Sequence, residues 1–371
     1  MFASLMGNRA VLEQLAALAG RSPAPPEGRT PQPGQPGLDC GGRSYLLAGP
    51  EGVGKRSAAW ELAAALNCLK KGMRPCGRCQ SCLEWRGGGH RDLKLIAPRS
   101  ETAEGKRRTQ GVITVEAARE ARDWLSLKPS YAYRVLVIDG AEGLSVSDAG
   151  DVLLKVLEEP PPRAVLFLVA ADEEALAATV RSRCQIFRFH PLTEAELLQL
   201  PALAALPATE RRSVVALAAG SAGVAQALAV DWDVVSARRR EMMQVLRQLR
   251  RAQPPELLER LEALEKWLGD PILPSLLAVA RSWYRDLRRL RLDLAPFDST
   301  WQAELADELS DWSLADLELA LWAVEDAHEA LGKFVSTRAT ANVLILRLAG
   351  VLPADGGREA RPTAGTLESG L

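Results

Sequence analysis

Hydrophobic residues between positions 44 and 189 occur in short, strand-like runs separated by amphipathic stretches. The runs lie at 44–48, 93–96, 134–139, 165–170 and 185–189. The stretches between them that repeat apolar residues at helical spacing lie at 55–69, 114–127, 148–158 and 173–181. Strands that alternate with helices of this length predict an α/β domain with a mainly parallel sheet, covered on both faces.

The pattern changes after His190. From Thr193 to about Leu348 the strand-like runs stop, and segments rich in Ala, Leu, Arg and Glu predict helices. Upstream of the sheet region, a short helix is predicted at about 9–19, followed by a Pro- and Gly-rich segment. We expect three domains, 1–190, 191–231 and 232–350, with a flexible insertion at 21–42 and a disordered tail at 351–371.

Length and composition are those of an ordinary water-soluble protein. The chain has 371 residues, 47% of them hydrophobic, which is enough for two or three domains. Neither a membrane-length apolar stretch nor a signal-peptide pattern is present at the start of the sequence, so we expect a cytoplasmic protein without membrane contact. The net charge of -1 means that any DNA contact needs a local patch or a partner. The basic runs 106–108 and 238–240 are interpreted as a loop tip and a solvated helix face.

A glycine-rich loop joins the strand at 44–48 to the helix at 55–69. Its glycines, Gly49, Gly52 and Gly54, are followed directly by Lys55. Such glycines let backbone N–H groups point into one cavity, and the lysine reaches the outer phosphates of a nucleotide. A plain glycine-rich turn is the alternative, but it would not need the lysine and both flanking elements in register. The next residue is Arg56, where the full motif has the Ser or Thr that binds magnesium, so nucleotide binding is compatible with this loop and metal-assisted hydrolysis is not.

Asp139 ends the apolar run at 134–139. Folds of this kind hold the magnesium-side aspartate at such a strand end. Active ATPases usually follow it with a Glu that polarises the attacking water, whereas this chain has Gly140, with Glu142 as the nearest acid. A strand that ends in Asp at a turn is common for structural reasons, so this residue gains significance only together with the phosphate-type loop.

Four of the six cysteines lie close together in the sequence, at Cys68, Cys76, Cys79 and Cys82. We expect two C-x2-C turns that share Cys79 to bring three thiolates together, and Cys68, at the end of the preceding helix, to supply the fourth ligand of a tetrahedral zinc site. Four reduced, buried cysteines are the alternative, which fits poorly with the polar residues between them. Cys40 and Cys184 lie outside this cluster, and His90 is interpreted as a surface or capping residue rather than a ligand.

The order of these motifs resembles the bacterial clamp-loader subunits of the AAA+ class. The most specific elements are LLKVLEEPPP at 153–162 and Ser-Arg-Cys at 182–184, and the resemblance covers about residues 1–230 apart from the insertion. It implies an AAA+ domain at 1–190 with a zinc module at 66–90, a helical lid at 191–231 and a collar at 232–350. The collar would hold the chain in a pentameric ring with tau/gamma motor subunits and a delta subunit, acting on a sliding clamp and primed DNA.

Within that family, the chain resembles the stationary, delta-prime type of subunit. Motor subunits keep Lys-Thr and Asp-Glu pairs where this chain has Lys55-Arg56 and Asp139-Gly140. The two sensor positions also depart from the family pattern, with Ala170-Ala171 and Val224. The resemblance therefore implies an assisting role without ATP hydrolysis, while ATP binding stays open. A divergent tau/gamma subunit with its own ATPase activity is the alternative, and a stand-alone zinc module for nucleic acid is disfavoured because no basic recognition helix follows the cysteines.

The resemblance gives Arg183 the role of an arginine finger. The arginine of the Ser-Arg-Cys motif projects into the active site of the neighbouring motor subunit, where it would stabilise charge on the transferred phosphoryl group. An ordinary surface ion pair is the alternative for this residue. Its position in the motif, and not its charge, singles it out.

Overall fold

In the computed structural model, residues 2, 5–20, 41–70, 73–101, 107–144, 148–249, 273–332 and 336–352 are described. They belong to two compact units, 1–205 with 218–227, and 206–217 with 228–371. Each unit is described by itself. The predicted insertion up to residue 40 and the predicted tail from residue 353 lie outside the described residues, and the three predicted domain boundaries stay predictions.

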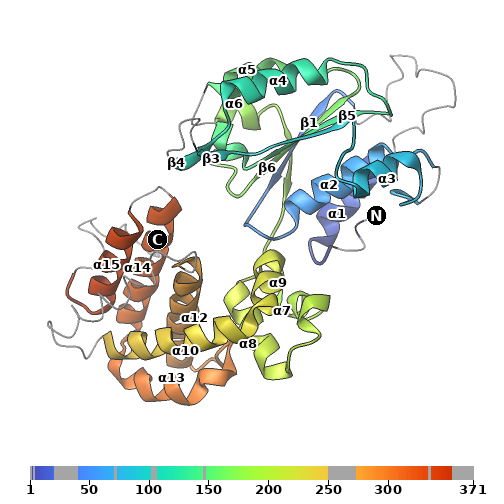
Figure 1. The fold of residues 1–371 in the computed structure, drawn as a ribbon. Coiled ribbons are helices and arrows are strands. Elements are labelled where there is room, and N and C mark those ends of the chain that lie inside the picture. Colours follow the sequence, from blue (N-terminus) through green and yellow to red (C-terminus); the bar gives the residue numbers. More distant parts are fainter. Residues whose placement is uncertain are drawn as a thin grey trace, which may run out of the picture. The chain divides into compact units, whose positions relative to one another are not determined.

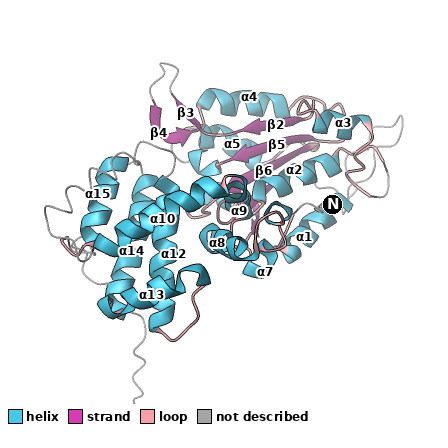
Figure 2. Ribbon diagram, turned by 60° about the horizontal axis from the view of Figure 1, so that its bottom comes forward, coloured by secondary structure: helices cyan, strands magenta, loops and turns pink. Residues whose placement is uncertain are grey.

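A parallel sheet forms the centre of the first unit (Figures 1 and 2). Among the described residues it has five strands in the order β2-β5-β6-β1-β7. Their bounds are β1 Arg43–Ala48, β2 Leu93–Ile96, β5 Arg134–Asp139, β6 Ala164–Ala170 and β7 Gln185–Arg188. All pairings are parallel, which confirms the predicted sheet. Every residue of the central strand β6 is buried, as expected for a strand with a neighbour on each side and cover on both faces.

Helices cover both faces of this sheet (Figure 1). One group comprises α1 Arg9–Gly20, α2 Lys55–Leu66 and α3 Gln80–Arg86, and the other α4 Val115–Leu125, α5 Ala149–Glu158 and α6 Ala178–Arg181. Leu46, Leu136 and Leu166 pack in one core with residues of α4 and α5. Their neighbours along the strands, such as Tyr45, point to the opposite face because side chains alternate along a strand. Helix α2, which covers this opposite face, begins at the candidate phosphate loop.

Two predicted helices are shorter than expected. The helix predicted at 173–181 exists only as α6. Before α6 the chain makes a turn, in which the Leu176 N–H donates to the Glu173 carbonyl oxygen at 3.2 Å. The Glu173 carboxylate binds Arg188. Helix α2 ends at Leu66, and at the next position the side-chain amide of Asn67 donates to the Tyr133 carbonyl oxygen at 3.0 Å and accepts from the Tyr133 N–H at 2.9 Å.

An antiparallel hairpin was absent from the sequence prediction. It consists of β3 Arg99–Glu101 and β4 Arg107–Val112. Its segments carry charged residues and a glycine and lack the apolar runs by which the other strands are recognised.

Helices make up the remainder of the described chain, as predicted. Within the first unit lie η1 Ala141–Leu144, α7 Glu194–Leu197, η2 Pro201–Leu203 and most of α9 Ala222–Val230. The second unit contains α8 Ala208–Ala218, α10 Trp232–Leu249, α12 Leu273–Arg291, η3 Ser299–Trp301, α13 Gln302–Glu308, η4 Leu309–Asp311, α14 Leu314–Gly332 and α15 Thr337–Leu348. No described helix is both long and apolar enough to cross a membrane.

The core of the second unit corrects one interpretation of the sequence. Arg239 was expected on a solvated helix face, but it is buried and forms an ion pair with the buried Asp298 at 2.5 Å. Burial raises the pKa of Asp298, but the Arg239 charge and hydrogen bonds outweigh this and leave it below its ordinary value. Tyr284 packs nearby against Trp312, with ring centroids 5.0 Å apart.

Candidate functional site

The loop between β1 and α2 requires its glycines. Gly49, Gly52 and Gly54 have φ angles of 140°, 71° and 98°, which side-chain-bearing residues rarely adopt. A Cβ at Gly49 would lie 2.2 Å from the Phe189 carbonyl oxygen, and one at Gly52 would lie 2.0 Å from Ser221 Oγ. The loop is therefore packed closely on its surroundings, as a backbone cradle for an anion must be.

A cavity of about 730 Å³ opens beside this loop, within the first unit. Its volume is in the range of ligand pockets, about 300–1,000 Å³. The cavity is lined by Gly52, Gly54, Lys55 and Asp139, whereas Gly49 belongs to the same loop but does not line the cavity. Four of the five residues proposed from the sequence are thus brought together although Asp139 is distant in the chain. The remaining lining residues are Leu5, Met6, Glu51, Val53, Arg56, Ser57, Gly140, Glu142, Val169, Ala171, Leu200, Ala222, Gly223 and Gln226.

Lys55 is buried at the start of α2. Its Nζ donates hydrogen bonds to the carbonyl oxygens of Gly49 and Pro50, each at 2.5 Å. Burial lowers the pKa of Lys55, and the charges of Glu51, Glu142 and Asp139 oppose that shift. The ammonium group is therefore held inside the loop, where a bound phosphate would lie.

Arg56 and Asp139 form an ion pair across the pocket. Nη1 of Arg56 lies 3.1 Å from Oδ2 of Asp139, and the arginine side chain is 59% exposed. The sequence showed that Arg56 replaces the Ser or Thr whose hydroxyl binds magnesium. It did not show that the Arg56 guanidinium binds the aspartate expected to face magnesium. No local pattern connects residues so far apart in the chain, so only the folded structure shows this pair.

The position after Asp139 does not accommodate a glutamate. Gly140 has a φ of 70°, and a Cβ there would lie 2.9 Å from Cγ of Pro98. The nearest acid, Glu142, lines the pocket, but its carboxylate accepts hydrogen bonds from the backbone N–H groups of Ala171 and, at 3.1 Å, Asp172. The pocket therefore lacks the usual carboxylate for polarising water at position 140, and its substitute at position 142 is engaged elsewhere.

Replacing Gly52 with alanine should destabilise the first unit more than replacing Gly88 with alanine. Both glycines have nearly the same φ, 71° and 74°, but a Cβ at Gly88 meets nothing within 4 Å. The new methyl at position 52 would displace Ser221 Oγ, which accepts a hydrogen bond from Val224 N–H at 3.1 Å. We expect an additional loss of about 1–2 kcal/mol, measured by denaturant unfolding. Equal losses would contradict the close packing of the loop.

Arg183 lies between α6 and β7 and does not line the described pocket. Its guanidinium forms an ion pair with Glu158 and donates to the Thr179 carbonyl oxygen at 2.7 Å. Glu158 belongs to the same LLKVLEEPPP segment that characterises the family resemblance. Arg183 is thus held by its own chain and lies outside the lining of the described pocket.

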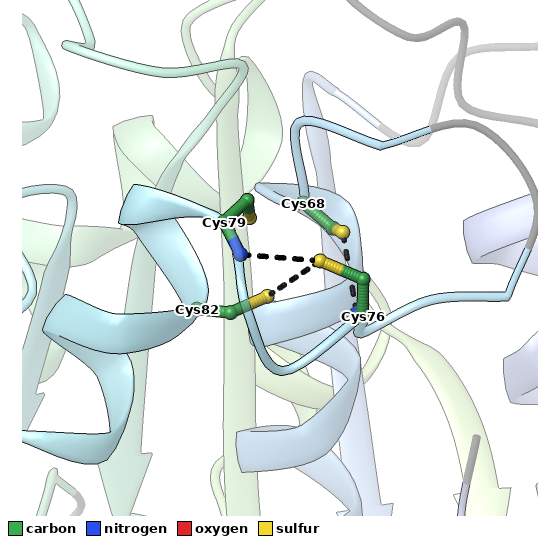
Figure 3. A group of neighbouring side chains, drawn as sticks. All are labelled: Cys68, Cys76, Cys79 and Cys82. Carbon is green, nitrogen blue, oxygen red and sulfur yellow. Dashed lines mark hydrogen bonds between the residues drawn. The ribbon is translucent and has the colours of Figure 1, made fainter.

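The four clustered cysteines converge on one point (Figure 3). Their sulfur atoms all lie within 4.8 Å of one another, and only Cys76 is not fully buried. Cys76 N–H points to the sulfur of Cys68 and Cys79 N–H to the sulfur of Cys76, both at 3.4 Å. Contrary to the expectation of two turns, Cys82 lies inside α3, which begins after Cys79. Four sulfur atoms this close together are the arrangement that a metal ion with four thiolate ligands needs.

The protonation of these thiols depends on their surroundings. Backbone N–H groups, first that of Arg78, lower the pKa of Cys76 to about 6, whereas burial raises the pKa of Cys82 to about 12. A bound cation would deprotonate all four thiols, since a coordinating thiol is held as thiolate.

Residues around the cluster attach it to the sheet domain. His90, expected as a surface or capping residue, is buried; its Nε2 lies 3.0 Å from Ser81 Oγ, and its Nδ1 accepts a hydrogen bond from the backbone N–H of Asp92 at 3.2 Å. Trp60 of α2 and Trp85 of α3 lie with ring centroids 4.5 Å apart. The cysteine segment is therefore packed on the same helix that begins at the phosphate-type loop. The sequence interpretation missed this network because each residue in it has no distinctive spacing of its own.

Comparison with known proteins agrees with this geometry. Residues 41–193 match the family described as DNA polymerase III, delta subunit. The tau subunit of DNA polymerase III from Bacillus subtilis is 34% identical over 152 residues, which is 40% of this chain and 25% of that protein. The delta' subunit from the same organism is 31% identical over 149 residues, 40% of this chain and 42% of the relative. The chain thus spans less than half the length of these relatives.

A solved structure of a gamma subunit-related protein from Thermotoga maritima covers 91% of this chain and 98% of its own, with 16% identity and a TM-score of 0.38. The segment matched by the family model contains the phosphate-type loop, the cysteine cluster, Asp139 and Arg183. Over about two fifths of its length, the chain is therefore similar to subunits of DNA polymerase III.

Proposed function

We propose that this chain is a delta-prime-like subunit of the DNA polymerase III clamp loader, one that assists ATP-driven loading of the sliding clamp without hydrolysing ATP itself. The observation that supports this most directly is the Arg56–Asp139 ion pair beside Gly140. Together they replace both groups that place magnesium and water for phosphoryl transfer. The partners under this proposal are tau/gamma motor subunits and a delta subunit in a pentameric ring, with the clamp and primed DNA bound by the complex.

We also propose that the cysteine cluster holds one structural zinc ion. A tetrahedron with Zn–S distances of about 2.3 Å has S–S edges of about 3.8 Å, and the sulfur atoms of Cys76 and Cys82 lie 4.0 Å apart. Four protein ligands leave no open position for water, so the metal would supply folding energy and not catalysis. The ligands would be Cys68, Cys76, Cys79 and Cys82.

Arg183 would act on ATP bound to the neighbouring motor subunit. A planar, permanently charged donor against phosphate oxygens can stabilise the transition state of a site to which it does not belong. The ion pair with Glu158 would have to be exchanged for the phosphate in the assembled ring. This role is consistent with the position of Arg183 outside the pocket of its own chain.

The purified chain should hydrolyse ATP negligibly and should co-purify with the other loader subunits. Competent enzymes of this type turn over at about 1 per second or faster, so steady-state ATPase assays of the chain alone distinguish the two kinds of subunit. Turnover at that rate, lost on Lys55→Ala, would favour the alternative of a divergent tau/gamma motor. The chain is about as similar in sequence to the tau relative as to the delta' relative, so this alternative needs the test. Failure to co-purify with the loader subunits would contradict the proposed function itself.

A further inference from the structure

Magnesium does not fit the pocket in its usual place. In phosphate-loop ATPases the ion is held by the hydroxyl after the lysine and by the strand-end aspartate. Here the first of these positions is Arg56, which offers no oxygen, and its guanidinium occupies the carboxylate of the second at 3.1 Å. Magnesium requires near-octahedral oxygen ligation. A guanidinium bound to the same carboxylate removes one ligand and adds a positive charge where the ion's charge would be.

We propose that Arg56 takes the place of the magnesium ion, so that this pocket binds a nucleoside polyphosphate without any divalent cation. The inference rests on the proposed function, in that the pocket is a nucleotide pocket. It goes further in naming the source of the positive charge, a side chain of this chain, and the consequence that magnesium is not needed for binding.

The charges around the pocket are arranged for such a ligand. Lys55 and Arg56 are adjacent at the start of α2, where Gly54 provides no side-chain cap and the first backbone N–H groups of the helix favour an anion. The carboxylate of Asp139 is neutralised by Arg56, and that of Glu142 is engaged by two backbone N–H groups. Two of the three acids that line the pocket, Asp139 and Glu142, are therefore bound by protein groups, and the third, Glu51, lies in the loop.

Arg56 can bind Asp139 and phosphate together. A guanidinium has five N–H donors in a rigid fork, and the contact with Asp139 uses Nη1. With 59% of its side chain exposed towards a cavity of about 730 Å³, the arginine is accessible to a ligand. Charge-assisted hydrogen bonds of this kind are among the strongest that a protein makes to phosphate.

Calorimetric titration of the full-length protein with ATP and with ADP tests this inference, each in EDTA and in excess magnesium. Three proteins are compared: the natural sequence, Arg56→Thr, and Arg122→Thr as a control. Arg122 lies on α4 and also pairs with an aspartate, Asp123 at 2.8 Å, but it does not line the pocket. The threonine at position 56 restores the hydroxyl of the full motif and removes the positive charge.

The natural protein should bind nucleotide equally well in both buffers. Arg56→Thr should bind about tenfold more weakly in EDTA, the equivalent of one lost charge-assisted contact, and should recover in magnesium. Arg122→Thr should behave as the natural protein does. The inference is overturned if the natural protein binds at least tenfold more tightly with magnesium, or if it binds neither nucleotide in either buffer. Co-purification with loader subunits is measured separately and does not depend on these outcomes, so failure here leaves the proposed function standing.

Discussion

Replacing Cys79 with serine should reduce the bound zinc from one ion per chain to almost none. The hydroxyl of serine is a poor ligand for zinc beside three thiolates, and structural zinc contributes about 10–16 kcal/mol in small zinc-binding peptides. The loss should be confined to the cysteine segment, because Cys68, Cys79 and Cys82 form a small core separate from that of the sheet. Metal analysis of the purified variant measures the zinc content directly.

Hydrogen exchange shows whether the effect is local. The Leu83 amide donates to the Cys79 carbonyl oxygen at 2.9 Å and should lose protection, whereas amides of the buried strand β6 should keep it. Cys184→Ser is the matched control, since Cys184 lies outside the cluster and burial raises the pKa of its thiol to about 12. Unchanged zinc content in Cys79→Ser would show that the cluster is not the metal site.

Replacing Arg183 with alanine or lysine should impair clamp loading by the reconstituted complex. At the one active site that receives this side chain, an arginine finger is worth about 10³–10⁵ in turnover. Lysine keeps the charge but not the planar fork, so it should not restore the activity. The total ATPase activity should fall only in part, because the other motor subunits keep their own fingers, and DNA-stimulated clamp loading is therefore the sharper measurement.

A neighbouring arginine provides the control for this experiment. Arg181 lies two positions earlier, in α6, and pairs with Glu174 at 2.5 Å. Arg181→Ala removes a similar charge and a similar ion pair but should leave loading unchanged. Gel filtration must show an assembled ring for each variant. Normal loading by Arg183→Ala in an intact ring would make Arg183 an ordinary surface residue, and failure of assembly would assign it a structural role instead.

The sheet could be predicted because its strands are nearly continuous apolar runs. β5 and β6 are buried on both faces, and this condition alone produces sequences such as VLVI and VLFLVA. The hairpin of β3 and β4 carries no such signal. The helix predicted at 173–181 shows the opposite error: its alanines favour a helix, but only its end is helical, and Glu173 at its start pairs instead with Arg188 of β7.

The candidate site was predicted in its members but not in its interactions. Spacing within the chain identified the glycines, Lys55 and the four cysteines, since each motif is local. The pairing of Arg56 with Asp139 joins two elements that only the folded sheet brings together. The steric conflict between a side chain at position 140 and Pro98 is likewise visible only in the folded structure. It shows that a glutamate cannot be accommodated at position 140 without a shift of Pro98.

The contact between Trp60 and Trp85 provides an optical signal for the state of the cysteine cluster. Two indoles whose centroids lie 4.5 Å apart at an angle of 49° couple their electronic transitions, which produces a pair of circular dichroism bands of opposite sign. Trp60 lies on α2 and Trp85 on α3, so loss of the proposed zinc ion would release α3 and separate the rings. Chelation should therefore abolish the bands and zinc should restore them. Because the chain has nine tryptophans, the spectrum of Trp85→Phe is subtracted to isolate the signal of this pair. The difference spectrum then permits zinc binding by the cysteine cluster to be followed in real time.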